Sequence, residues 1–187
     1  MVFPNAETSL KEVVKFAKTA NFSRHDDQNT RESDGGSYAL TACMIPRPVH
    51  IQQVTETIIG CAIEVHKTLG AGLLESVYRE CMIIELVQAQ LCFEHERNIK
   101  LTYKGVAING RLRLDLIVEG IVVVELKAIE CVHPIHLSQV ITYLKLADCP
   151  AGLLLNFNVT SMRNGVRRLA HPDLYTSKSK ETEPISS

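Results

Sequence analysis

The chain has 187 residues, 45% of them hydrophobic, with 20 basic and 21 acidic side chains and a formal net charge of −1. This length matches one ordinary domain with tails, and the apolar content is enough for a sheet covered by helices. The balanced charge argues against coating of nucleic acid by bulk positive charge, but it leaves room for a local basic groove. No apolar run is long enough to span a bilayer and no secretory signal is recognisable, so we expect no membrane association.

The cysteines are scattered and form no CxxC pair, which argues against a zinc ribbon. We expect all of them to be reduced and mostly buried in a cytoplasmic protein. They are Cys43, Cys61, Cys81, Cys92, Cys131 and Cys149.

Composition divides the chain into a central domain and two tails. Residues 1–49 form an N-terminal extension, in which 10–17 could form a short amphipathic helix before the polar, glycine-containing stretch 21–37. The domain is expected over residues 50–172. Residues 173–187 are rich in Ser, Thr, Lys and Glu, which is typical of a disordered tail.

Within the domain the hydrophobic period changes in a clear order. Apolar residues at helical spacing end at Gly70, and Lys104-Gly105 and Glu119-Gly120 mark turns between strands. The order α-α-β-β-β-α-β-β predicts an α/β fold with a mixed central sheet flanked by helices. The expected helices cover 54–69, 73–90 and 134–147, and the expected strands cover 92–103, 107–118 (kinked near Asn109-Gly110), 121–128, 151–158 and 165–170.

Two of these strands carry acidic residues in apolar surroundings. Glu125 and Lys127 share one face of their strand, and the tight turn before that strand can bring Asp115 beside Glu125. Adjacent carboxylates repel unless a cation bridges them, and Mg²⁺ or Mn²⁺ suits such oxygen ligands. Lys127 could orient or deprotonate an attacking water, or stabilise charge on a phosphate.

The same alternation places Arg111, Arg113 and Asp115 on one face, with Leu112, Leu114 and Leu116 all pointing into the core. We therefore expect both arginines to project from the site and Arg113 to reach a phosphate. The alternative is an ion pair between Arg113 and a nearby acid such as Glu94 or Glu130.

Two helices add polar residues. Gln139 and Tyr143 lie on one helix face and could hold a water or phosphate, or could form an ordinary half-buried face. Glu75 and Tyr78 lie near the start of the second helix, where a carboxylate is favoured by the helix dipole with or without a function. By itself the Asp115, Glu125 and Lys127 pattern also fits surface ion pairs. Its position in the apolar run 121–129 favours a site, because charge there is costly unless it is used.

The motif Gly72-Leu-Leu-Glu75-Ser-Val-Tyr78 resembles the signature of the GxxExxY proteins, a family within the PD-(D/E)XK nuclease superfamily. The resemblance runs from about residue 51 to 169. It implies a restriction-endonuclease-like core, with Glu75, Asp115 and Glu125 as metal ligands and Lys127 as the catalytic lysine. The Gln139-xxx-Tyr143 pair resembles the QxxxY motif of RecB-like members, and the usual PD dipeptide is Leu114-Asp115 here.

The expected function is therefore a Mg²⁺- or Mn²⁺-dependent nuclease, an (exo)deoxyribonuclease acting on DNA, with Arg113, Arg111 and Tyr78 as substrate contacts. Only Cys149 follows Tyr143, so no iron–sulfur cluster is expected. The alternatives are a non-catalytic nucleic-acid-binding or protein-interaction module with the same fold, and an enzyme acting on another phosphoester. A homo-oligomer remains open, and the sequence names no protein partner.

Overall fold

The computed structural model describes residues 50–176, so the predicted helix at 10–17, the rest of the N-terminal extension and residues 177–187 of the predicted tail lie outside the described residues. Of Asn109, Gly110 and Arg111 the backbone alone is described. In chain order the elements are α2 Ile51–Leu69, α3 Glu75–Gln88, β1 Phe93–Tyr103, β2 Val106–Val118, β3 Val122–Lys127, α4 Pro134–Ala147, β4 Ala151–Asn156, α5 Met162–Gly165, β5 Val166–Ala170 and α6 Pro172–Thr176.

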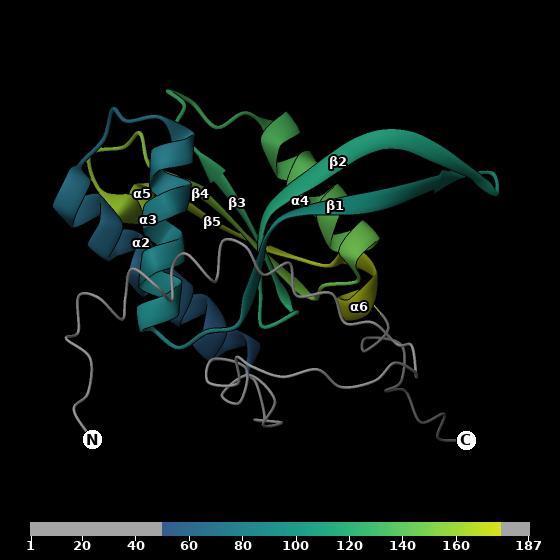
Figure 1. Cartoon of the computed structure of the whole chain (residues 1–187), viewed down its shortest axis with the longest axis horizontal. Helices are drawn as coiled ribbons and strands as arrows, with labels where there is room; N and C mark the ends of the chain where they lie inside the picture. Colours follow the sequence, from purple (N-terminus) through teal and green to yellow (C-terminus); the bar gives the residue numbers. More distant parts are fainter. Residues whose placement is uncertain (1–49, 177–187) are drawn as a thin grey trace, which may run out of the picture.

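The strands form one five-stranded sheet in the order β1-β2-β3-β4-β5. Strands β3 and β4 are parallel and every other neighbouring pair is antiparallel, because α4 carries the chain back between them. Figure 1 shows α2 and α3 on one side of this sheet and α4 on the other. The predicted mixed sheet flanked by helices, with a restriction-endonuclease-like order, is confirmed.

Strand β3 is the centre of the molecule, and both of its faces are covered. Val122, Val124 and Leu126 pack in the cluster shared with α2 and α3, whereas Val123 packs in the cluster shared with α4. A strand covered on both faces is expected to be a nearly continuous apolar run. Glu125 interrupts that run and is itself 4% exposed. The sheet therefore places a carboxylate in a position with little access to water.

A tight turn sets the pairing of β2 with β3. Glu119 and Gly120 both have positive φ, 53° and 68°, which is the twist that a two-residue hairpin needs. The resulting register pairs Leu116 with Val124 and Val118 with Val122. The printed pairing ends at Leu116 and Val124, so Asp115 and Glu125 are the next residues of the two strands beyond the last pair.

Strands β1 and β2 extend beyond the sheet as a two-stranded arm. Strand β2 pairs with β3 from Leu116 to Val118, while its pairing with β1 continues out to Val106. In Figure 1 this arm projects away from the layered body of the molecule. Its pairing shifts register between Ile99 and Leu101, which accounts for the irregularity predicted near Asn109-Gly110.

The faces of β2 differ from the prediction in one respect. Leu112 and Leu114 pack with the α4 cluster, whereas Leu116 packs with the α2–α3 cluster. The prediction that all three point to the same side is wrong, because the backbone is irregular opposite Asp115, where Glu96 has a φ of 50°. Asp115 thus lies between Leu114, which faces α4, and Leu116, which faces α2 and α3.

Three smaller findings concern the helices and the cysteines. The sequence did not indicate α5 or α6, and α6 begins at Pro172, the last residue of the predicted domain, and continues into the predicted tail. Cys61, Cys131 and Cys149 are reduced and Cys81 is in no disulfide, but Cys92 is disulfide-bonded, so the expectation of reduced cysteines is wrong for Cys92. Over the part of the chain that is described, the helices are too short or too polar to cross a membrane.

Candidate active site

Glu125 and Lys127 form the centre of the candidate site, at the carboxyl end of β3. Both project from the same face of the strand, and the Lys127 Nζ donates a hydrogen bond of 2.7 Å to the Glu125 Oε1. The second carboxylate oxygen, Oε2 of Glu125, is buried and has no hydrogen-bond partner. An unpartnered buried carboxylate oxygen is costly, so this atom is available to a ligand that brings positive charge.

Asp115 approaches the end of β3 from the neighbouring strand. Its Oδ2 accepts a hydrogen bond of 2.9 Å from the backbone N–H of Leu126, in the region where β2 has stopped pairing with β3. Its Oδ1 lies 3.0 Å from the Arg79 guanidinium. The carboxylate therefore takes the place of a missing backbone acceptor and anchors β3 to β2 beside Glu125.

Arg79, which the sequence analysis missed, joins the acidic residues. Its Nη2 lies 3.4 Å from Glu75 Oε1 as well as 3.0 Å from Asp115 Oδ1, and its Nη1 lies 3.5 Å from Glu96 Oε1. The Arg79 side chain is 15% exposed, and its Nε has no partner. The i, i+4 spacing of Glu75 and Arg79 on α3 was a signal in the sequence, because it puts both side chains on one face.

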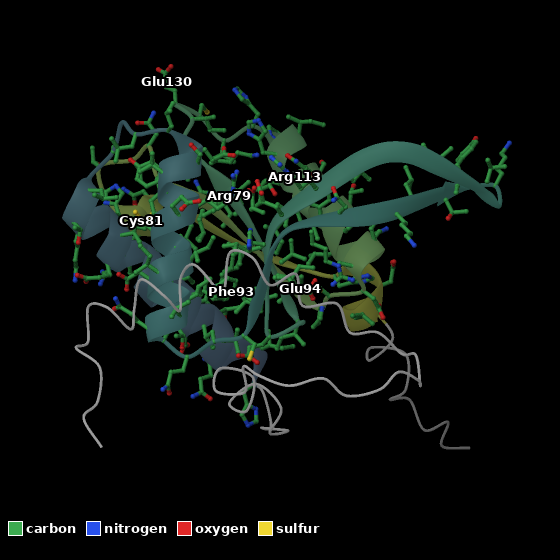
Figure 2. The ribbon with its side chains drawn as sticks, in the orientation of Figure 1. Arg79, Cys81, Phe93, Glu94, Arg113 and Glu130 are labelled. Atoms are coloured by element: carbon green, nitrogen blue, oxygen red, sulfur yellow. The ribbon has the colours of Figure 1, made fainter. Side chains whose placement is uncertain are left out.

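Arg113 also meets Glu96 rather than the acids expected for it. The Arg113 Nη1 lies 3.1 Å from Glu96 Oε1, so the predicted alternative, an ion pair with a nearby acid, is formed, but with Glu96 instead of Glu94 or Glu130. Figure 2 shows Arg79 and Arg113 close together between α3 and the base of the arm, with Glu130 well apart from them. The positive φ of Glu96 is unfavourable for a side chain with a Cβ, and this conformation accompanies its contact with both arginines. Arg113 remains 55% exposed, which leaves it accessible to a ligand.

Burial and mutual repulsion shift the protonation of the cluster. Burial, and then the charge of Asp115, raise the pKa of Glu125 to about 7, although Lys127 acts in the opposite direction. Burial also raises the pKa of Glu75, with Lys127 and Arg79 opposing the shift and Asp115 adding to it. Burial lowers the pKa of Lys127, but the hydrogen bond to Glu125 and the surrounding carboxylates raise it further, so the net shift is upward. Lys127 is thus held as an ammonium, whereas the positive charge around the Glu125 carboxylate is too small to offset its burial and the repulsion from Asp115.

Gln139 and Tyr143 lie on the face of α4 that packs toward the sheet. The Gln139 Nε2 donates a hydrogen bond of 2.9 Å to the Tyr143 hydroxyl, and Tyr143 is 6% exposed in the cluster under α4. Helix α4 packs against both β3 and β4. Gln139 and Tyr143 are therefore on the same side of the sheet as Val123 and Glu125. The hydrogen bond described for them joins Gln139 to Tyr143.

Tyr78 has a structural position, which corrects its predicted substrate contact. Its side chain is 0% exposed and stacks on Phe157, with 4.4 Å between the ring centroids. Its hydroxyl donates to the Gly70 carbonyl at 2.7 Å and accepts from the Leu73 N–H at 3.2 Å. Tyr78 thus holds the α2–α3 turn in place, which positions the start of α3 and Glu75. The side chain of Arg111 lies outside the described residues.

The donor set fits a hard divalent ion in part. Asp115 and Glu125 offer carboxylate oxygens, and Mg²⁺ commonly uses one or two carboxylates while keeping several waters. Among the described residues, no three acidic, histidine or cysteine side chains are arranged around one ion. The reason is visible in the contacts, because Arg79 bridges Glu75 and Asp115 and keeps Glu75 from completing a triad.

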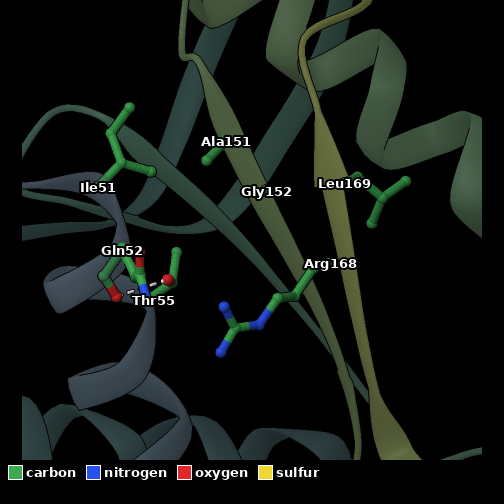
Figure 3. Close-up of a pocket in the computed structure, with 7 residues that line it drawn as sticks. All are labelled: Ile51, Gln52, Thr55, Ala151, Gly152, Arg168 and Leu169. Atoms are coloured by element: carbon green, nitrogen blue, oxygen red, sulfur yellow. Dashed lines mark hydrogen bonds between the residues drawn. The ribbon is translucent and has the colours of Figure 1, made fainter.

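A separate pocket of about 330 Å³ is lined by α2, β4 and β5 (Figure 3). Ala151 and Gly152 line it at the start of β4, whereas the carboxylates lie near the other end of the parallel pair, where Lys127 aligns with Asn156. Arg168 is the charged residue that lines it. This pocket is therefore distinct from the acidic cluster.

The model of the PD-(D/E)XK nuclease superfamily matches residues 52–169. The chain therefore belongs to that superfamily, and the match spans every element from α2 to β5. Neither the curated proteins nor the solved structures contain a match. Membership in a superfamily composed mostly of nucleases makes a metal-dependent nuclease the activity that the chain's class suggests.

Proposed function

We propose that this protein is a Mg²⁺- or Mn²⁺-dependent nuclease that hydrolyses phosphodiester bonds of DNA, and that it belongs to the GxxExxY group within its superfamily. The observation that carries the proposal is the buried Glu125 Oε2, which has no partner and lies beside Asp115 with Lys127 held on the other oxygen. A structural ion pair would not need a second carboxylate at this position, because Lys127 already satisfies one charge.

Asp115 and Glu125 would hold the divalent ion, with Glu75 as an adjacent acidic group. When bound there, the ion supplies Lewis-acid chemistry for the phosphate and for the attacking water. Lys127 is charged and within reach of Glu125, so its role is to stabilise negative charge that develops on the phosphate, through a preorganised ammonium in a site with little water. This role differs from general-base catalysis, which the raised pKa of Lys127 disfavours.

Gln139 and Tyr143 are proposed to position the attacking water or a phosphate oxygen from the α4 side. Because they are hydrogen-bonded to each other, the Gln139 amide fixes the orientation of the Tyr143 hydroxyl. Arg113 is proposed to bind a phosphate next to the scissile one, since it is exposed at the edge of the cluster and linked to it through Glu96 and Arg79.

One observation favours the second candidate, a non-catalytic nucleic-acid-binding module. Arg79 already provides a cation to Glu75 and Asp115, as a protein that has replaced its metal by an internal guanidinium would do. The two candidates differ in the fate of Arg79, which must leave Asp115 in the nuclease and remains in place in the binding module.

The experiment is a cleavage assay with linear, circular and single-stranded DNA and with RNA, in Mg²⁺, in Mn²⁺ and in EDTA. We expect cleavage of DNA with either ion, none in EDTA, and a loss of at least about 100-fold in Lys127→Ala, because one preorganised charge contributes a factor of this size. Lys67→Ala is the matched control, since Lys67 is an exposed lysine on α2. DNA binding without cleavage under all conditions would favour the binding module.

A further inference from the structure

The β1–β2 arm has a charge distribution unlike that of the rest of the chain. From Arg97 to Leu114 it carries five basic residues and no acidic one, although the whole chain has a net charge of −1. The basic residues are Arg97, Lys100, Lys104, Arg111 and Arg113. The chain as a whole has no net positive charge, but this projecting element has a local excess of it.

The geometry of the arm is that of a two-stranded antiparallel ribbon. Its tip is the turn Lys104-Gly105, where both residues have positive φ, 49° and 79°, as a tight twisted hairpin requires. Ile99 is buried against the α4 cluster and anchors the base. From Lys100 outward the described side chains are exposed, except that Leu101 is half-buried. Such a ribbon is narrow enough to enter a groove of duplex nucleic acid.

The tip adds apolar and aromatic surface to this charge. The register pairs Tyr103 with Val106 and Leu101 with Ile108, so these four residues share one face of the ribbon. Tyr103 is 62% exposed and Val106 is 64% exposed. The Lys104 Nζ lies 5.5 Å from the centroid of the Tyr103 ring. Aromatic rings interleaved with lysines are a common arrangement for contacting bases together with phosphates.

The base of the arm leads directly into the candidate site. Arg113 contacts Glu96, Glu96 contacts Arg79, and Arg79 contacts Asp115. A polyanion that lies along the arm would therefore be directed toward Asp115 and Glu125. The salt bridges among the described residues include neither Lys100 nor Lys104, whereas Arg113 at the base of the arm is paired with Glu96.

We propose that the β1–β2 arm is a nucleic-acid-binding element that grips the substrate outside the cleaved nucleotide. Lys100, Lys104 and Arg113 contact phosphates, while Tyr103 and Val106 at the tip contact sugars and bases. A second copy of the chain is a poorer occupant, because two arms with only positive charge repel each other. This inference rests on the proposed function in so far as the DNA is also the substrate, but binding by the arm can be measured without any cleavage.

The test is the affinity for a labelled 30-base-pair DNA duplex and for one of its strands, measured by fluorescence anisotropy in EDTA at several salt concentrations. The Lys100→Ala/Lys104→Ala double variant should bind roughly tenfold more weakly, and its log–log salt slope should fall by about 1.8, as expected for two lost phosphate contacts. Tyr103→Ala should weaken binding about fivefold through loss of stacking, with little change in the salt slope.

The matched control is Lys67→Ala/Lys145→Ala, which removes two exposed lysines from α2 and α4 and should leave the affinity within about twofold. Unchanged affinity and salt slope in both arm variants, with unchanged melting curves, would overturn the proposal. So would a wild-type dimer that Tyr103→Ala dissociates while DNA affinity stays the same, because the arm would then be a protein interface.

The outcome also separates this inference from the proposed function. Wild-type protein that binds DNA through the arm but cleaves neither DNA nor bis(p-nitrophenyl) phosphate with Mn²⁺ would contradict the nuclease and leave the arm proposal standing. Wild-type protein that cleaves both substrates, while the arm variants bind and cleave DNA normally, would contradict the arm proposal and leave the nuclease standing.

Discussion

At the scale of single residues, the site is determined by an imbalance of charge. Glu125 is buried beside Asp115, and Lys127 compensates one of its oxygens but not the other. Asp115 is better satisfied, since it meets both Arg79 and the Leu126 N–H. The repulsion that the sequence predicts therefore falls mainly on Glu125, and substitutions of Glu125 should reveal it.

The first prediction is a stability that decreases with pH in the metal-free protein. The pKa of Glu125 is raised from 4.5 to about 7, so the folded state binds more protons than the unfolded state between these values. This contribution, of roughly 3 kcal/mol, is fully present below about pH 4.5 and is lost as the pH rises through about 7.

Chemical denaturation between pH 4.5 and 8 measures this decrease. Glu125→Gln should flatten the profile and should be more stable than the wild type at pH 8, because the amide carries no charge to desolvate. Glu64→Gln, at an exposed position on α2, should keep the wild-type profile. A wild-type stability that rises steadily over this range would contradict the burial of an uncompensated Glu125.

The second prediction concerns Arg79 as the internal cation of the cluster. Arg79→Ala leaves Glu75 and Asp115 without their shared guanidinium, so the metal-free protein should lose roughly 2 kcal/mol of stability. Arg79→Lys should recover part of this loss, since an ammonium cannot bridge the carboxylates as a planar guanidinium does. Thermal melts with and without Mn²⁺ provide the measurement.

If Arg79 and the metal compete for Asp115, the effect of Mn²⁺ on the melting temperature should differ between the wild type and Arg79→Ala. If Arg79 must leave Asp115 when an ion binds, then Mn²⁺ should raise the melting temperature of Arg79→Ala by more than that of the wild type. An equal or smaller rise in the variant would show that Arg79 does not compete with the ion.

At the scale of elements, a close contact between α5 and β4 supports the end of the sheet where the site lies. Gly165 packs directly on the carbonyl of Asn156, and a Cβ at position 165 would overlap that backbone. Asn156 in turn bonds the N–H and the carbonyl of Ile129 through its side chain, which holds the chain just after Lys127. Glycine at 165 thus supports the site indirectly.

The third prediction follows from this packing. Gly165→Ala should lower the free energy of unfolding by about 3 kcal/mol, because the backbone of β4 has to move. Gly60→Ala is the matched control, since Gly60 lies in α2 with open space around it and should become more stable by roughly 0.5 to 1 kcal/mol. Urea denaturation of both variants measures the difference, and a neutral Gly165→Ala would contradict the close contact.

The elements were the part most accessible to sequence reasoning. The apolar run of β3, the turn at Glu119-Gly120 and the helical periodicity of α2 are local signals, and all of them are confirmed. The faces of β2 were not accessible, because the irregularity at Glu96 resets the alternation and no turn residue marks it. Arg79 was missed for a related reason, since its partners Asp115 and Glu96 come from other strands.

At the scale of the whole molecule, the fold separates three surfaces. The parallel pair β3–β4 ends at the acidic cluster, the pocket near Ala151 lies toward the other end, and the basic arm projects from the side of β2. The mixed sheet also divides the core in two, with α2 and α3 covering one face and α4 the other. The site is placed where these layers meet the base of the arm.

The central claim is that Asp115 and Glu125 form a divalent-ion site, and a calorimetric titration of the metal-free protein with Mn²⁺ at pH 7.5 tests it most directly. We predict binding of an ion by the wild type, loss of that binding in Glu125→Gln, and unchanged binding in the exposed control Glu64→Gln. Binding that is equal in the wild type and Glu125→Gln, or absent from both at millimolar Mn²⁺, would contradict the account.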